Sequence, residues 1–158
     1  MTLHLDELKT AIVRDRRVGA VVFDVRPRPK SPGQILRRPR ATCEMAPIFD
    51  KYVTCFGLFG LGVNWTEILR PQAEDLLCRV LTSHITSHEE LMARRSAETY
   101  ANCFLNQFSP TCQMVTNGPF KHMVLDSGRS ATNGPAIDTG VVCADRDNIG
   151  LLWIGDHD

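Results

Sequence analysis

The sequence lacks the short motifs that identify common catalytic and cofactor sites. It contains no H-E-x-x-H zinc motif, no G-x-S-x-G nucleophile turn and no C-x-x-C pair. Its glycine-rich stretch, residues 57–62, has the spacing G-x-x-G-x-G without a following Lys-Ser or Lys-Thr, so it does not match a phosphate-binding loop. These absences disfavour metalloprotease, serine-hydrolase and nucleotide-binding functions, and we expect no cofactor and no bound metal.

The chain also lacks net charge and long hydrophobic segments. Its 18 basic and 18 acidic residues cancel, so the chain as a whole is not a polyanion binder. The longest apolar-looking stretch, residues 52–66, is uncharged but contains three glycines and is shorter than the roughly 20 residues of a membrane-spanning helix. Residues 1–10 have no basic start followed by an apolar block, so we expect no secretion signal. Six widely spaced cysteines then predict reduced thiols in a cytoplasmic protein without membrane contact.

The sequence does contain enough hydrophobic residues to form a core. With 43% hydrophobic residues, the 158-residue chain is expected to form a single globular domain spanning 1–158. Leu5, Leu8 and Ile12 predict a first helix, and apolar residues at helical spacing predict two more over 71–84 and 87–108. The third helix is expected to begin at Ser87, because Ser-x-x-Glu is a capping box. The second and third helices should form a hairpin that covers a sheet.

Five segments have the composition of β-strands, bounded by turn residues. They are residues 20–25, 111–115, 120–126, 138–144 and 149–154. The short polar turn 145–148 predicts that the last two strands pair antiparallel. The fold class is therefore predicted to be α+β, with a mixed, mainly antiparallel sheet of about five strands covered by a helical hairpin plus an N-terminal helix.

Two further segments are harder to interpret from sequence. Residues 46–65 mix aromatic side chains with glycines, and we expect a strand or irregular packed structure there. The tetrapeptide T-N-G-P occurs at 116–119 and again at 132–135. Asn-Gly favours a tight turn, but the following proline forces extended geometry and removes a donor. These copies predict two independent turns rather than an internal repeat.

Positive charge is concentrated near the start of the chain. Residues 14–40 hold nine basic residues against Asp15 and Asp24. Residues 26–42, which overlap this region, predict a proline-rich basic loop, because proline is incompatible with a helix interior. The loop is either a solvated connection or a nucleic-acid-binding arm, although no aromatic residues alternate with its charges to stack on bases. The candidate nucleic-acid-binding residues are Arg26, Arg28, Lys30, Arg37, Arg38 and Arg40.

Several cysteines and histidines in the middle of the chain are candidate metal ligands or nucleophiles. Its members are Cys78, His84, His88, Cys103 and Cys112. A helix start at Ser87 would place the two histidines on different helices, which argues against a shared zinc site. A cysteine nucleophile needs a nearby base, and the sequence pairs no cysteine with His122 or His157. We therefore assign no catalytic residue.

The C-terminus has the most unusual composition. Asp156, His157 and Asp158 directly follow a predicted core strand, and Asp145 and Asp147 lie in the preceding turn. A simple hairpin would place the two groups at opposite ends, so they would not form one metal site. They either solvate the strand ends or form an acidic surface that selects a basic partner.

The function predicted from these features is a non-enzymatic protein-binding module. An immunity-type or inhibitor protein, which neutralises a partner protein through charged surface, fits this description. One alternative is a nucleic-acid-binding accessory protein using residues 14–40. A second alternative is a small metal-dependent or cysteine hydrolase using His122, His157, Asp126 or a cysteine. Nothing in the sequence identifies the partner.

Overall fold

The last two strands of the chain form the centre of the sheet. β6 (Ile137–Ala144) and β7 (Asn148–Asp156) pair antiparallel along their whole length and are joined by a tight turn. β1 (Ala20–Pro27) pairs antiparallel with the other side of β7, from Ala20↔Gly155 to Pro27↔Asn148. The predicted hairpin of the last two strands is confirmed.

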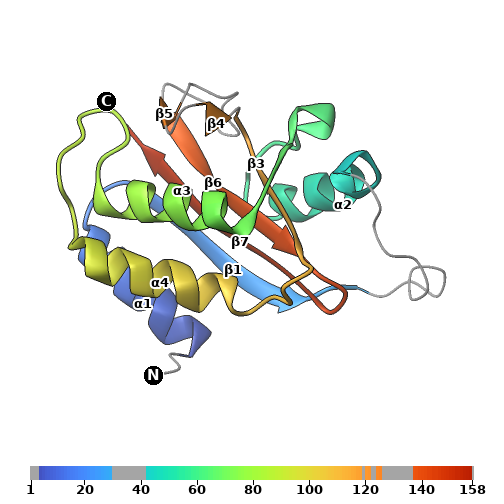
Figure 1. Cartoon of the computed structure of the whole chain (residues 1–158), viewed down its shortest axis with the longest axis horizontal. Coiled ribbons are helices and arrows are strands. Elements are labelled where there is room, and N and C mark those ends of the chain that lie inside the picture. Colours follow the sequence, from blue (N-terminus) through green and yellow to red (C-terminus); the bar gives the residue numbers. More distant parts are fainter. Residues whose placement is uncertain (1–3, 30–41, 119, 122–123, 126–136, 158) are drawn as a thin grey trace.

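Two shorter strands complete the sheet beyond β6. β3 (Gln113–Thr116) pairs with β6, and β2 (Thr66–Ile68) pairs with β3, so the strand order is β1-β7-β6-β3-β2 (Figure 1). All four pairings are antiparallel. The computed structural model describes residues 4–29, 42–118, 120–121, 124–125 and 137–157.

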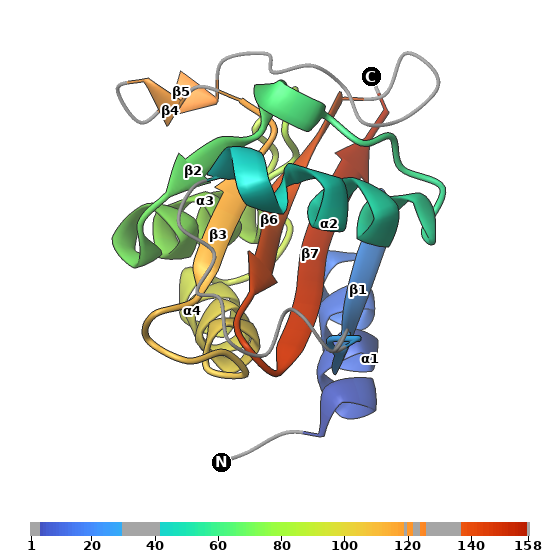
Figure 2. The ribbon, with the colours of Figure 1, turned by 90° about the vertical axis from the view of Figure 1, so that its right-hand side faces the viewer.

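Helices cover both faces of the sheet. α1 (Leu5–Arg16), α3 (Arg70–Thr82) and α4 (Arg94–Leu105) pack on one face, and α2 (Thr42–Thr54) lies on the other (Figure 2). Nearly every residue of β6 and β7 is therefore buried, which explains why these strands are apolar on both sides rather than alternating. The predicted α+β class is confirmed.

α1 and α3 form where their sequences predict helices. α1 has Asp6 and Glu7 in its first turn and buries Leu8 and Ile12, which are four residues apart and fully inaccessible. α3 has Pro71 in its first turn, where a missing N–H costs nothing. No helix in the described part of the chain is long and apolar enough to cross a bilayer.

The prediction of a strand or irregular structure for residues 46–65 is wrong over its first half. α2 occupies this half and buries Met45, Phe49 and Val53, which are spaced four residues apart along one side of the helix. The glycines begin only at Gly57, after the helix has ended. Sequence reasoning treated the two halves as one segment and so missed the helical period.

The predicted helix start at Ser87 is also wrong, because α4 begins at Arg94. The Ser87 hydroxyl accepts a hydrogen bond from the backbone N–H of Glu89 instead of capping a helix. Residues 83–91, called here the 83–91 loop, fold back on themselves through a bridge between Ser83 and Glu90. The Leu91 N–H donates to the Thr82 carbonyl, which closes the loop.

Residues 120–126 do not form one strand of the main sheet. β4 (Phe120–Lys121) and β5 (Val124–Leu125) instead pair with each other as a separate two-stranded hairpin (Figure 1). The predicted basic loop 26–42 is shorter at both ends than predicted, since β1 extends to Pro27 and α2 begins at Thr42. Residues 30–41 of that loop lie outside the described residues.

Gly19 provides a test of how the N-terminal helix is joined to the sheet. It connects α1 to β1 with φ of 79°, and a Cβ here would overlap the Asp156 carboxylate and lie 2.6 Å from Nη1 of Arg16. Gly19→Ala is expected to lower the free energy of unfolding by about 3 kcal/mol, because it strains the backbone and separates a buried ion pair.

The matched control is Gly155→Ala, where an added Cβ would meet nothing closer than 3.9 Å. Chemical denaturation should show a change within about 1 kcal/mol for this variant. Equal losses in the two variants would contradict the steric account.

Candidate functional site

Asp156 is not on the surface, which corrects its assignment to an acidic recognition site. Its side chain and that of Arg16 are both fully inaccessible. The guanidinium binds the carboxylate in a bidentate manner, with Nη1 to Oδ1 at 2.7 Å and Nη2 to Oδ2 at 2.6 Å. A carboxylate in this position cannot touch a partner without unfolding of the strand end.

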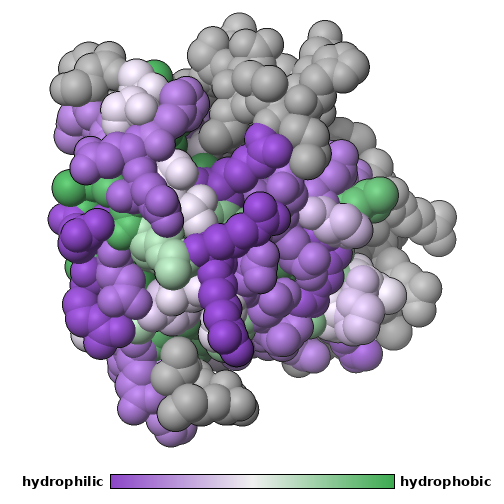
Figure 3. Space-filling model, turned by 60° about the vertical axis from the view of Figure 1, so that its left-hand side comes forward, coloured by the Kyte–Doolittle hydropathy of each residue, from purple (hydrophilic) through white to green (hydrophobic). Residues whose placement is uncertain are grey.

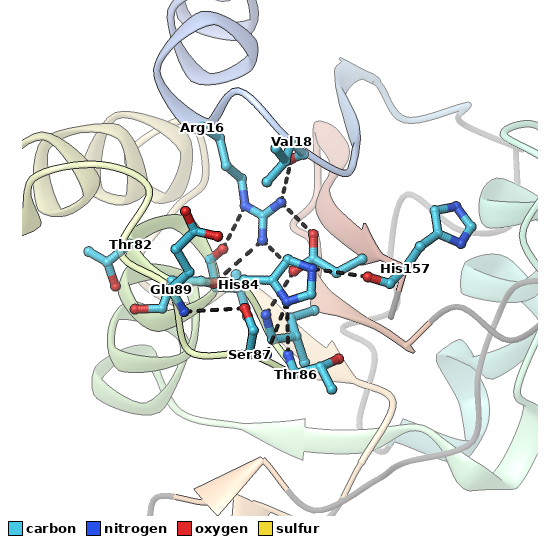
Figure 4. Close-up of polar contacts among 12 residues, drawn as sticks. Arg16, Val18, Thr82, His84, Thr86, Ser87, Glu89 and His157 are labelled. Carbon is cyan, nitrogen blue, oxygen red and sulfur yellow. Dashed lines mark hydrogen bonds and ion pairs between the residues drawn. The ribbon is translucent and has the colours of Figure 1, made fainter.

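Arg16 also binds three backbone carbonyl groups, one each from the turn before β1, from α3 and from the 83–91 loop. Nε donates to Val80 at 2.8 Å, Nη1 to Val18 at 2.7 Å and Nη2 to Ser83 at 3.5 Å. Dashed lines in Figure 4 mark the bonds of Arg16, including the one to Val18. All five N–H donors of the guanidinium therefore have acceptors, which is the condition for burying this charge. The Arg16–Asp156 pair thus connects α1, α3, β7 and the 83–91 loop.

The environment of Asp156 keeps its carboxyl group ionised. Burial alone would raise its pKa, but the hydrogen bonds from Arg16 and from the backbone N–H of Ile85, the latter 2.8 Å long, lower the pKa below its usual value. The folded chain therefore binds a proton at Asp156 less readily than the unfolded chain does.

His84 organises the 83–91 loop, at the end of α3. Its Nδ1 accepts hydrogen bonds from the backbone N–H groups of Thr86, at 3.2 Å, and Ser87, at 3.1 Å. The proton of the neutral ring is therefore on Nε2, which donates to the backbone carbonyl of His157 at 3.1 Å (Figure 4). Both ring nitrogens of His84 therefore bind backbone groups. His157 takes part in this contact through its backbone carbonyl group and not through its ring.

The cysteines and histidines weighed as zinc ligands do not form a metal site in the described part of the chain. No three His, Cys, Asp or Glu side chains among those residues lie close enough to share an ion. His88 follows His84 on the same loop and has φ of 60°, which turns the chain back towards α4. The predicted separation of His84 and His88 onto two helices is wrong, since both belong to one loop.

The two acids of the β6–β7 turn have different roles. Oδ1 of Asp145 accepts the backbone N–H groups of Asp147 and Asn148, and its Oδ2 accepts that of Ser109 at 2.8 Å. Asp145 therefore forms the turn and fastens it to the end of α4. The side chain of Asp147 is exposed, at the opposite end of the hairpin from Asp156. Asp158 lies outside the described residues.

The two described members of the basic group are bound to the body of the protein. Arg26 pairs with Asp24 at 2.8 Å and lies over the rings of Tyr52 and Phe56. Half-buried Arg28 donates to the carbonyl of Asp145 at 3.1 Å. Lys30, Arg37, Arg38 and Arg40 lie outside the described residues, so nucleic-acid binding through them stays a prediction.

The first T-N-G-P segment forms part of a buried polar cluster that sequence reasoning missed. Thr116 ends β3, and its hydroxyl donates to the Gly140 carbonyl at 2.7 Å. The Asn117 amide donates to the carbonyl of Asp138 at 2.8 Å, and the Thr139 hydroxyl donates to the Asn117 side chain at 2.9 Å. These bonds join the ends of β3 and β6. The second copy, 132–135, lies outside the described residues.

The surface feature that sequence reasoning missed is the loop after α2, residues 56–63, called here the apolar loop. It contains only Phe, Leu, Val and Gly. Leu58 and Leu61 are buried, whereas Phe59 is 47% exposed and Val63 is 90% exposed. Figures 1 and 2 show the short helix η1 (Gly62–Asn64) projecting above the sheet beside α2.

A single carboxylate holds the apolar loop in place. Oδ1 of Asp50 on α2 accepts the Gly62 N–H at 3.2 Å and the indole N–H of Trp65 at 2.7 Å. Gly60 packs so closely on Asp50 that a Cβ would lie 2.5 Å from its Cγ. Gly57 and Gly62 supply the left-handed bends, with φ of 76° and 52°. The exposed Phe59 and Val63 are therefore on an ordered support.

The face of the molecule around the 83–91 loop has a different character. Figure 3 shows it to be dominated by hydrophilic side chains, with hydrophobic ones in small separate patches. Isolated patches of this size are normal on a protein surface. The apolar loop, on the other side, is the stronger candidate for a contact surface.

The chain matches no family model, and no curated protein or solved structure is significantly similar to it.

The pH dependence of stability tests the assignment of Asp156. Because its folded-state pKa lies below the unfolded value of about 3.9, its carboxylate stabilises the fold above about pH 4, and this contribution is lost as the pH falls through the folded-state pKa. Asp156→Asn should cost about 3 kcal/mol at pH 7, and the difference from the wild type should shrink below pH 4.

Urea unfolding between pH 7 and pH 2 measures this difference directly. Glu89→Gln, which changes an exposed carboxyl group on the 83–91 loop, is the control, with an expected change within about 0.5 kcal/mol at every pH. A difference between Asp156→Asn and the wild type that did not vary with pH would show that ionisation of Asp156 contributes nothing.

Proposed function

We propose that this chain is a protein-binding module whose contact surface is the apolar loop. The observation that carries the proposal is the 90% exposure of Val63 on a segment that Asp50 fixes from below. When a partner covers an apolar side chain that is exposed to water, the free energy of the system falls, so binding is favoured there. Phe59, half exposed on the same loop, adds an aromatic ring of the kind that dominates interface energetics.

The rigidity of the loop favours recognition of a partner by shape. Association costs less when the contacting side chains are already ordered, since little conformational entropy is lost. The buried residues Leu58, Leu61 and Trp65 anchor the loop from inside, and the Trp65 ring packs edge-on against that of Trp153 in the sheet. The backbone that carries Phe59 and Val63 is therefore anchored on both sides of these residues.

An inhibitor or immunity-type role is the finer proposal. Such a protein acts by covering part of its target with a preformed surface, and the loop has the features that this requires. The contact proposed here is apolar rather than acidic. The charges of Asp145, Asp156 and Arg26 are committed to partners within the chain, which leaves them less available for recognition.

A protein partner fits the loop better than a lipid surface or a nucleic acid. Residues 56–66 contain no basic side chain, and Arg26, which packs against Phe56, is already paired with Asp24. Binding to anionic lipid or to phosphate relies on free positive charge near the contact. A partner with a complementary apolar pocket needs none.

Charge substitution on the loop tests this proposal. Immobilised wild type, Val63→Asp and Leu69→Asp are exposed to lysate of the source cells, and the retained proteins are quantified. Leu69 is the control because it is 71% exposed but lies outside the loop, at the start of α3, where aspartate is favourable. At least one protein should be retained by the wild type and Leu69→Asp and reduced more than tenfold by Val63→Asp.

Other results would reject the proposal. If all three forms retain the same proteins in equal amounts, the loop is not the contact surface. Sedimentation with vesicles of phosphatidylcholine and phosphatidylglycerol, lost on Val63→Asp, would assign the loop to membranes instead. Unfolding curves of the two variants confirm that each is folded before the comparison is made.

A further inference from the structure

The imidazole ring of His84 holds residues 86–89, called here the tip of the 83–91 loop. Its Nδ1 accepts the backbone N–H groups of Thr86, at 3.2 Å, and of Ser87, at 3.1 Å. A ring nitrogen accepts a hydrogen bond only while it carries no proton, because both nitrogens of a protonated imidazole are donors. Both bonds to the tip therefore require a neutral ring.

The rest of the loop is fastened by bonds that a proton on this ring leaves intact. The Leu91 N–H donates to the Thr82 carbonyl at 2.7 Å, which closes the base of the loop. The Ile85 N–H donates to the carboxylate of Asp156 at 2.8 Å. Nε2 of the ring donates to the carbonyl of His157, and it remains a donor after protonation. Of these contacts, the two bonds at the tip are the ones that need an unprotonated nitrogen.

The backbone of the tip is strained and has little packing to hold it. His88 has φ of 60°, in the left-handed region that residues other than glycine and asparagine seldom adopt. Its N–H donates to the carbonyl of His84 at 3.0 Å, which wraps the chain around the ring. The side chains of residues 86–90 are all exposed. Loss of the two bonds to Nδ1 therefore releases the tip, because core contacts do not replace them.

The surroundings of His84 offer a protonated ring no ion pair in exchange. In the described part of the chain, no carboxylate is hydrogen-bonded to the ring, which is half-buried and so accessible to protons. Asp156, the buried acid whose charge acts on the ring, is bound through both oxygens by Arg16. The other charged or titratable groups in the neighbourhood, some of them visible in Figure 4, are Arg17 of α1, Arg79 of α3, His157 after β7, and His88, Glu89 and Glu90 of the loop itself.

These groups do not compensate for a proton on Nδ1. Arg79 is paired with Asp75, and Arg17 donates to the carbonyl of Leu91. Glu89 and Glu90 are exposed, so water and salt screen their attraction for the ring. Protonation would thus place an N–H where two backbone N–H groups already point.

We propose that His84 is an acid-sensitive switch that releases the tip of the 83–91 loop when its ring is protonated. The proton adds to Nδ1 while that on Nε2 stays, so the ring gains one positive charge and loses two acceptor bonds. Histidine is the side chain that ordinarily changes charge between about pH 8 and about pH 5. Because the closed tip excludes the proton, the released form becomes more populated as the pH falls. The switch does not involve the apolar loop or its proposed partner.

A pH titration of the isotope-labelled, full-length protein by NMR tests this proposal. The ¹⁵N shifts of the His84 ring report its protonation, and amide hydrogen exchange, corrected for its intrinsic pH dependence, reports the tip. Protection of the Thr86 and Ser87 amides should fall by about tenfold or more, with the midpoint of the ring titration, because two hydrogen bonds are lost. The Leu91 and Ile85 amides should change by less than about twofold, since their acceptors do not titrate in this range.

The same substitution at two positions separates the ring of His84 from the other histidine of the loop. His84→Asn provides an amide oxygen that accepts hydrogen bonds and does not titrate, so the tip should stay closed at both ends of the pH range. His88→Asn removes an exposed ring, and asparagine tolerates the positive φ there. This control should respond to pH as the wild type does. Circular dichroism checks the fold of both variants, and the wild-type titration decides the proposal even if His84→Asn unfolds the chain.

Four outcomes would overturn the proposal. The first is protonation of His84 in the folded protein without loss of protection at Thr86 and Ser87. The second is a ring that stays neutral throughout the titration. The third is release of the tip at the same pH in His84→Asn, which would assign the response to another group. The fourth is loss of protection at Leu91 and Ile85 together with the tip, which would show that the whole loop opens.

Discussion

The burial of one ion pair determines how the ends of several elements meet. Arg16 and Asp156 are both fully inaccessible, and removal of either partner would leave a charge without water or a counter-ion. The pair brings the end of α1 to the end of β7, and it takes carbonyl groups from α3 and from the turn before β1. Because Asp156 also accepts the Ile85 N–H, the 83–91 loop depends on the same carboxylate.

Sequence periodicity was sufficient for the parts of the fold that local physics decides. β1, β6 and β7 follow runs of Val, Ile and Leu, and the polar turn at Asp145 predicted their closing hairpin. The first part of residues 46–65 was missed because its helical spacing is followed directly by glycines. The start of α4 was missed because Ser87 satisfies the capping-box pattern while its neighbours are held by contacts with His84, which no local pattern reveals.

The candidate site depended on information that the sequence does not contain. In the sequence, Asp156 has the pattern of a residue in an exposed C-terminal tail. Only its contact with Arg16, 140 positions away in the chain, shows that it belongs to the buried interior. Val63 reads as one more apolar residue in a hydrophobic stretch, and only the fold shows that it faces water while Leu58 and Leu61 face inward. A charged pair is thus buried in the interior here, and the surface that we propose for partner contact is apolar.

The central claim is that the Arg16–Asp156 pair couples the 83–91 loop to the main sheet. Native-state hydrogen exchange of wild type and Asp156→Asn tests it most directly, through the amides of Ile85, Leu91 and β7. Coupling predicts that all of these amides lose protection by a similar factor in the variant, since one opening event exposes them. Loss of protection at Ile85 alone, with Leu91 and β7 unchanged, would contradict the claim and reduce the pair to a local contact.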